Sequence, residues 1–222
     1  AFSGTSFLDS MALTTYNLVF TAAPVALVAW FDRDLSGPNA LRHPERYQDA
    51  VSGDWLSLRT FVGHWALRAV WQAAVVFWVV QGALPTGSDR GRLNNDTAFL
   101  AQSAFALVLL VHAVTLVVEL HVRPRLFLAF HGATTLGLYL LLLVLRNNPA
   151  LLPARVPGAF FDPGLATRLG HDPAFWLALP LAALLALGPV EIVRAATPWL
   201  AANAAQRRRA RVDPSRERVV LV

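Results

Sequence analysis

The sequence predicts an all-α membrane protein, a polytopic bundle of five transmembrane helices. Hydrophobic residues make up 55% of the 222-residue chain and charged residues 15%, which is too apolar for a soluble domain of this size. Segments long enough to cross a bilayer, which takes about 20 residues, recur along the chain. They run over about 11–31, 61–80, 97–120, 126–145 and 173–193.

The first segment contains no charged side chain but has a polar stripe. Thr14, Asn17 and Thr21 stand at i, i+3 and i+7, so an α-helix places all three on one face. Pro24 has no N–H, so we expect the carbonyl of Phe20 to lose its helical partner. The stripe predicts either a site that handles something polar or a set of hydrogen bonds to a neighbouring helix.

Charged and imidazole side chains occur within the next three segments. Arg68 lies about two turns into the second segment, and its stem is long enough to carry the charge back to the surface, which we favour over a role in an ion path. His112 and His131 are expected to be neutral and bonded to a neighbouring helix. A metal site is not expected, because no second histidine or carboxylate stands at ligand spacing.

Packing signals and a basic tail complete the chain. Small residues four apart predict helix contact faces on the second and fourth segments. They are Ala69 with Ala73, and Ala133 with Gly137. Glu191 and Arg194 predict a local ion pair in the last segment. Four prolines within 147–172, with Pro173 at the edge, predict an irregular loop there, and residues 201–222 are expected to form a basic cytosolic tail.

The arginines predict the orientation. If the amino end is exoplasmic or lumenal, twelve arginines fall on the cytosolic side and four on the other side, so the carboxyl end is cytosolic. The net charge of +5 sits at membrane flanks and in the tail, which favours a membrane surface over nucleic acid as partner. Without cysteine, disulfides and thiolate metal sites are excluded.

No catalytic residue set can be assembled from this sequence. It has no Gly-rich phosphate loop, no paired carboxylates and no Ser/His/Asp arrangement. Helices interrupted near the middle of the membrane are a common way to build transporter sites. Taken from the residues alone, the chain is therefore a helical membrane bundle with one polar, proline-interrupted helix.

Four motifs in order resemble the P4-type ATPases, the phospholipid flippases. They are Phe2-Ser3-Gly4, Tyr16-Asn17-x-x-Phe20-Thr21-x-x-Pro24, Phe31-Asp32-Arg33-Asp34-Leu35-Ser36 and Leu41-Arg42-x-Pro44-x-x-Tyr47. The resemblance extends over about residues 2–200, with its specific part in 2–47. It identifies the five segments with spans six to ten of that family. The chain departs from the family at Ala22-Ala23, at Arg68 and His112, where the family usually has Asn, and at Glu191.

The resemblance implies a function and a site. It implies a C-terminal membrane part of an ATP- and Mg²⁺-dependent enzyme that moves phospholipid from the outer to the cytosolic leaflet, with the catalytic half preceding this chain. It assigns Asn17 to the lipid headgroup, with Thr14, Thr21, Tyr16 and Phe20 as further substrate-binding candidates. It also implies a small accessory membrane subunit facing the outer loops.

A second hypothesis is a truncated, non-catalytic membrane partner or lipid-binding helical bundle. The chain begins at Ala1 rather than Met, which favours a piece of a longer protein. An Asp-Lys-Thr-Gly phosphorylation motif upstream in the same reading frame would distinguish the two. A third hypothesis, an unrelated carrier, would require inverted repeats, and the sequence contains none that we recognise.

Overall fold

The structure is a computed structural model that describes residues 10–31, 61–84, 97–119, 125–151 and 162–212, with isolated positions at 8, 41, 57 and 58. Three of the four motifs lie wholly or mostly outside the described residues, namely those at 2–4, 31–36 and 41–47. Within the described ranges every regular element is a helix and none is a strand. This agrees with the predicted all-α class.

Among the described residues, five helical stretches are long and apolar enough to cross a membrane, at 12–30, 61–83, 97–119, 127–147 and 173–196. Each lies where the sequence predicted a span. The elements in order are α1 (Ser10–Thr15), η1 (Tyr16–Thr21), α2 (Ala22–Phe31), η4 (Phe61–Ala66), α6 (Leu67–Ala83), α7 (Thr97–Glu119), α8 (Arg125–Gly132), η5 (Ala133–Gly137), α9 (Leu138–Asn147), η6 (Pro149–Leu151), α10 (Leu165–His171) and α11 (Pro173–Val212).

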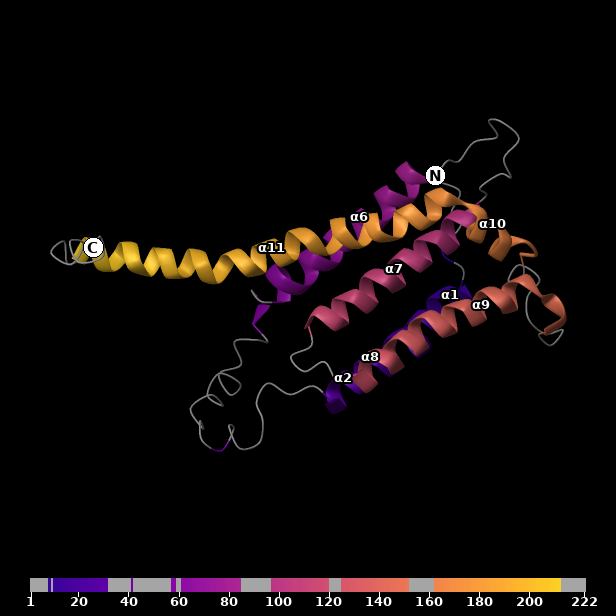
Figure 1. Ribbon diagram of the computed structural model, residues 1–222, viewed down its shortest axis with the longest axis horizontal. Helices are drawn as coiled ribbons and strands as arrows, with labels where there is room; N and C mark the ends of the chain where they lie inside the picture. The colour runs from indigo at the N-terminus through magenta and orange to yellow at the C-terminus, as the bar shows by residue number, and fades with distance from the viewer. Residues whose placement is uncertain are drawn as a thin grey trace. The chain divides into compact units, whose positions relative to one another are not determined.

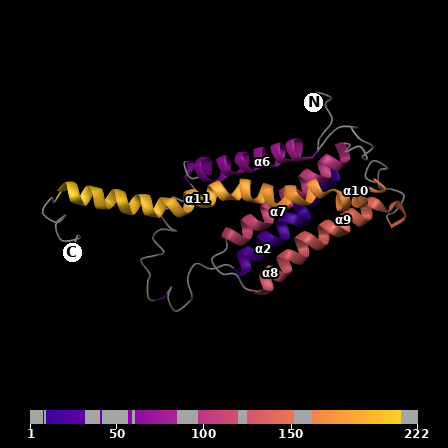
Figure 2. The same cartoon turned by 45° about the horizontal axis from the view of Figure 1, so that its top comes forward.

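The chain divides into two compact units, Ala1–Ala186 and Leu187–Val222. In the first unit α7 is the central helix. It packs against α6 on one side and against α8 on another, and α2 packs against α8 (Figures 1 and 2). The core follows α7, where Phe99, Phe105 and Leu107 are almost completely buried. A central helix that is apolar at nearly all positions is what a membrane bundle requires.

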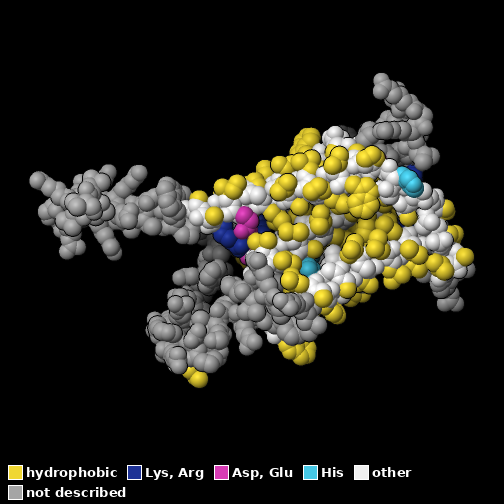
Figure 3. Space-filling view, in the orientation of Figure 1, with side chains coloured by type: hydrophobic (Ala, Val, Ile, Leu, Met, Phe, Trp, Pro, Cys, Tyr) yellow, Lys and Arg dark blue, Asp and Glu magenta, His cyan; other side chains and the backbone are white. Residues whose placement is uncertain are grey.

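Apolar side chains also cover the outward faces of the helices (Figure 3). Trp65, Trp71 and Trp78 of the second span and Leu18 of the first are all exposed. In water such faces would be costly, but hydrocarbon is as apolar as leucine, so a membrane helix gains little by hiding them. The exposed faces are therefore consistent with a bundle surrounded by lipid.

Three of the spans contain a π-helical segment, namely η1, η4 and η5. π-Helices are rare, and where they occur as short interruptions they are frequent at functional sites. The first of them, η1, ends three residues before Pro24, the residue that cannot donate a backbone hydrogen bond. The predicted interruption of the first helix is thus present, as a change of helical pitch that begins before the proline.

The predicted small-residue contact faces are wrong for the described helices. Ala69, Ala73, Ala133 and Gly137 are all exposed, and a Cβ placed on Gly137 would meet nothing within 4 Å. The buried small residues lie instead on α11, at Ala178, Ala182 and Ala186. There the indole Nε1 of Trp71 on α6 donates to the carbonyl of Leu185 at 3.1 Å.

The segment between the fourth and fifth spans contains a helix that the sequence did not predict, α10. Leu165 and Leu169 on α10 are buried, and the helix packs against α7 and α9. Gly164 precedes it with φ of 94°, a value that favours glycine, and its N–H donates to the Asn147 side chain at 2.6 Å.

The last helix, α11, extends well beyond the predicted span and ends at Val212. Its start is capped by Asp172, whose carboxylate accepts from the Ala174 N–H at 2.9 Å, and Pro173 occupies the first helical position. In the second unit Arg194 pairs with Glu191 at 3.4 Å, as predicted from their i, i+3 spacing. The part of the expected tail that the structure describes, residues 201–212, is helical.

Candidate functional site: a polar face on the first span

The polar stripe of the first span is partly exposed. Asn17 and Thr14 are exposed, and Thr21 is half-buried. The hydroxyl of Thr21 donates to the Asn17 carbonyl at 2.9 Å, so these two residues lie together on the helix. None of the residues that the structure describes bonds the Asn17 side chain, whose amide therefore remains available to both donors and acceptors.

The aromatic candidates of the same span point the other way. Phe20 is 2% exposed, and its ring lies 5.6 Å from that of Phe105 on α7. Tyr16 is half-buried and makes edge contacts with Phe105 and with His112 at centroid distances of 6.5 and 6.1 Å. These edge-to-face arrangements are favourable for aromatic rings. Tyr16 and Phe20 thus fasten the span to α7, and Asn17 faces elsewhere.

Pro24 is fully buried one turn beyond this segment. The sequence predicted that the carbonyl of Phe20 would be freed. The carbonyl that receives a side-chain hydrogen bond is that of Asn17, from Thr21. Because the Thr21 proton is used within the helix, its hydroxyl can still accept but no longer donates to a ligand. The donor that the described polar face offers at this level is therefore the Asn17 amide.

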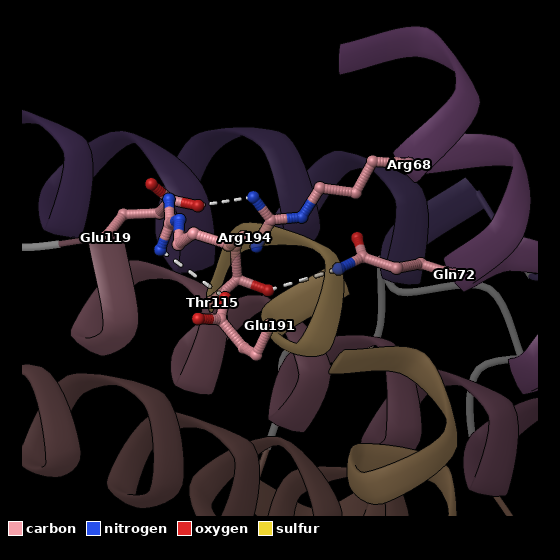
Figure 4. A network of polar contacts seen from close by, with 6 residues as sticks. All are labelled: Arg68, Gln72, Thr115, Glu119, Glu191 and Arg194. Carbon is pink, nitrogen blue, oxygen red and sulfur yellow. Dashed lines mark hydrogen bonds and ion pairs between the residues drawn. The ribbon is translucent and has the colours of Figure 1, made fainter. Parts of the chain in front are cut away.

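A second polar group joins α6 to α7 and was not predicted as a group. Arg68 forms an ion pair with Glu119, and Nε2 of Gln72 donates to the Thr115 hydroxyl at 3.3 Å. Figure 4 shows the two α6 side chains reaching the two α7 side chains; Glu191 and Arg194, drawn in the same view, are the separate pair of the second unit. The sequence signal was present, since each helix places its two polar residues at i, i+4 on one face.

Arg68, whose stem was expected to carry its charge back to the surface, is buried within the bundle and reaches Glu119, the last residue of α7. Its side chain is 7% exposed, and its charge meets the carboxylate of Glu119. Its Nε and Nη2 have no hydrogen-bond partner within the described ranges. A guanidinium in a low-dielectric environment requires a nearby negative charge, and here the carboxylate supplies it from the neighbouring helix.

The predicted bond from a histidine to a neighbouring helix is confirmed for His131. Its Nε2 lies 3.2 Å from the carbonyl of Ala113, so α8 bonds to α7 across the interface. Its ring stacks on Phe127 with centroids 5.5 Å apart. Nowhere in the described ranges do three His, Asp or Glu side chains gather in a way that would hold a metal ion. The described side chains of this site are therefore suited to hydrogen bonding with polar groups.

These features define a class of protein, a helical multi-pass membrane protein with an exposed amide beside a π-helical interruption. The sequence profile of the family described as "Phospholipid-translocating P-type ATPase C-terminal" matches residues 1–203. The chain therefore belongs to this family, as its motifs had indicated.

Individual relatives agree with the family. The chain is 27% identical over 191 residues to phospholipid-transporting ATPase FetA of Mus musculus, which covers 85% of this chain and 16% of the mouse protein. It is 28% identical over 148 residues to probable phospholipid-transporting ATPase tat-5 of Caenorhabditis elegans, covering 66% and 13%. It is 39% identical over 75 residues to phospholipid-transporting ATPase 2 of Arabidopsis thaliana, covering 34% and 7%. The chain thus spans less than a fifth of each relative.

Proposed function

We propose that this chain is the C-terminal membrane portion of an ATP-driven flippase that moves phospholipid from the outer to the cytosolic leaflet. The family match over residues 1–203 carries the proposal. Because the chain spans 16% of the mouse relative, ATP hydrolysis with Mg²⁺ is assigned to the remainder of a complete enzyme. This chain contributes part of the lipid path and a supporting bundle.

Within that path the Asn17 amide is proposed to meet the lipid headgroup. The support is its exposure and its lack of a partner among the described side chains, next to Thr14 and Thr21. An amide donates and accepts hydrogen bonds without the large desolvation cost of a charge, so it can hold and release a headgroup inside a membrane. Tyr16 and Phe20 are proposed to position this face indirectly, by holding the first span against α7.

The proposed orientation places the amino end on the exoplasmic or lumenal side and the carboxyl end in the cytosol, as the arginine distribution predicts. The loop over 32–60 then faces the phosphorylation domain of the complete enzyme. The loops that follow the second and fourth spans face a small accessory membrane subunit. In this arrangement α10 lies on the same side as that subunit.

The experiment compares Asn17→Leu with Leu18→Ala in the longest natural protein that carries this chain. Leu18 is the matched control because it is exposed, apolar and adjacent in η1. We expect Asn17→Leu to lower lipid-stimulated ATP turnover per folded molecule about tenfold or more, which corresponds to about 1.4 kcal/mol of lost transition-state stabilisation. Leu18→Ala should change turnover less than twofold.

Two outcomes would count against the proposal. Equal turnover in Asn17→Leu and wild type, with a lower melting temperature, would return Asn17 to the role of holding helices together. A natural protein without ATPase activity, stable without any catalytic part, would favour the non-catalytic partner or lipid-binding bundle instead. If neither outcome is observed, the same turnover assay with a panel of lipid headgroups identifies the preferred substrate.

A further inference from the structure

The last span contains a proline, Pro189, in the interior of α11. Because proline has no N–H, the carbonyl four residues earlier, that of Leu185, lacks its usual helical donor. Within hydrocarbon no water replaces that donor, and an unsatisfied carbonyl is costly there. The helix therefore needs a hydrogen-bond donor from elsewhere at this position.

The side chain of Trp71 on α6 supplies this donor. Its indole Nε1 donates to the Leu185 carbonyl oxygen at 3.1 Å, a normal length for such a bond. An indole N–H can only donate, so it suits an acceptor that has lost its own donor. The same turn of α6 also contacts α7, through the side chains of Arg68 and Gln72. One turn of the second span thus joins two other spans.

The parts of α11 before and after Pro189 differ in what holds them. Before it, small buried side chains pack α11 into the first unit, namely those of Ala178, Ala182 and Ala186. The boundary between the two compact units follows Ala186 directly, and Ile192, beyond the proline, is 70% exposed. A Cβ placed on Gly188 would meet no described atom within 4 Å, so the turn at the proline has room to bend. Proline is a common cause of sharp bends in long helices.

We propose that residues 185–189 form a hinge in the last span and that Trp71 holds the part of α11 that precedes it. The indole satisfies the carbonyl that Pro189 leaves free, so α11 stays attached to α6 up to Leu185 while the part beyond Pro189 changes direction. Trp71 is 44% exposed, so burial of its ring does not account for its position. The hinge is a property of the last span itself and does not depend on the proposed lipid transport.

The test measures a distance across the hinge in the longest natural protein that carries this chain, purified in detergent. This chain has no cysteine, so spin labels can be attached at Leu177→Cys and Ile192→Cys once cysteines outside the chain are replaced. Both positions are exposed, and they lie about 22 Å apart along an α-helix, at about 1.5 Å per residue. Double electron–electron resonance then gives the distribution of the distance between the labels.

The proline is tested by Pro189→Ala, which restores a backbone N–H to the Leu185 carbonyl. We expect the distance distribution of the protein with Pro189 to be about twice as wide as that of Pro189→Ala, because the substitution removes the cause of the bend. Equal widths would overturn the hinge.

The role of Trp71 is tested by Trp71→Phe, which keeps an aromatic ring but removes the donor. It should widen the distribution about 1.5-fold further when Pro189 is present, and leave it unchanged together with Pro189→Ala, where the carbonyl no longer needs the indole. Trp78→Phe is the matched control, because Trp78 is also exposed on α6 and has no hydrogen bond to α11 within the described ranges.

Two results would contradict the role of Trp71. The same widening by Trp71→Phe with and without Pro189 would mean that the ring acts by packing and not through the carbonyl that proline frees. An unchanged width in Trp71→Phe, or the same change in Trp78→Phe, would also overturn it. This comparison of the two tryptophans decides the matter even if Pro189→Ala fails to fold.

Discussion

Breaking the ion pair between Arg68 of α6 and Glu119 of α7 should destabilise the bundle. The loss of stability should depend on which of the two residues is replaced. Arg68 is 7% exposed and Glu119 is 29% exposed. Removal of one member of a buried pair costs about 3–5 kcal/mol, because the other charge is left without compensation. Glu119→Gln leaves a guanidinium that is almost completely buried, so we expect the full loss. Arg68→Met leaves a carboxylate that water reaches in part, so we expect about 2–3 kcal/mol.

The double variant isolates the interaction itself. In Arg68→Met/Glu119→Gln neither charge is stranded, so part of the stability should return, with a coupling energy of about 2 kcal/mol. Gln72 and Thr115 provide the matched control one turn away on the same two helices. Their neutral hydrogen bond should give a coupling energy of only about 0.6 kcal/mol, the usual size for such bonds in membrane bundles.

The assay is reversible unfolding of the purified protein in mixed micelles, followed by tryptophan fluorescence. The four variants of each cycle are measured at the same protein and detergent concentrations. If Arg68→Met and Glu119→Gln prove additive, within about 0.5 kcal/mol, the two charges do not interact in the folded state. If Arg68→Met is the more damaging single variant, the argument from unequal burial fails.

Two further predictions concern packing and topology. Ala182→Leu should lower the free energy of unfolding by about 1–3 kcal/mol in the same assay, because Ala182 is fully buried. Gly137→Ala should not lower it, because that position faces open space. Equal effects of the two substitutions would mean that α11 does not pack through its alanines. Because the chain has no cysteine, Asn148→Cys and Arg211→Cys can each be labelled with an impermeant maleimide in sealed vesicles, and we expect reaction from opposite sides. Labelling of both from one side would contradict an odd number of crossings between them.

The spans could be predicted from sequence because their signal is long and local. Each span is an apolar run of sufficient length, and hydrocarbon enforces helix formation by leaving no water to bond the backbone. The π-helical segments could not be predicted, because no local pattern of residue types marks them. η5 covers Ala133–Gly137, a stretch without proline, and its pitch has no signature in the residue types. Only the interruption near Pro24 was predicted, because proline removes a specific donor.

The partner of Arg68 shows what reasoning about a single helix does not reach. One helix considered alone offers its arginine only two choices, the surface or the costly interior. The partner that resolves the choice, Glu119, lies 51 residues away on another helix. The outcome depends on which faces of α6 and α7 meet. That information is tertiary, and the small-residue pairs used to infer it pointed to exposed faces instead.

The exposure of Asn17 follows from the anchoring of its neighbours. Tyr16 and Phe20 stand at i, i+4 and are held against α7 through Phe105. Asn17 directly follows Tyr16, and Thr21 directly follows Phe20. Because consecutive residues of a helix point in different directions, Asn17 and Thr21 lie on a face rotated away from α7. Acyl chains cannot bond an amide, and a bare amide in hydrocarbon is unfavourable. In a complete enzyme another helix or a lipid headgroup must therefore cover Asn17. If a headgroup covers it, Asn17→Leu lowers ATP turnover more than it lowers the stability of the fold; if a helix covers it, stability is lost first.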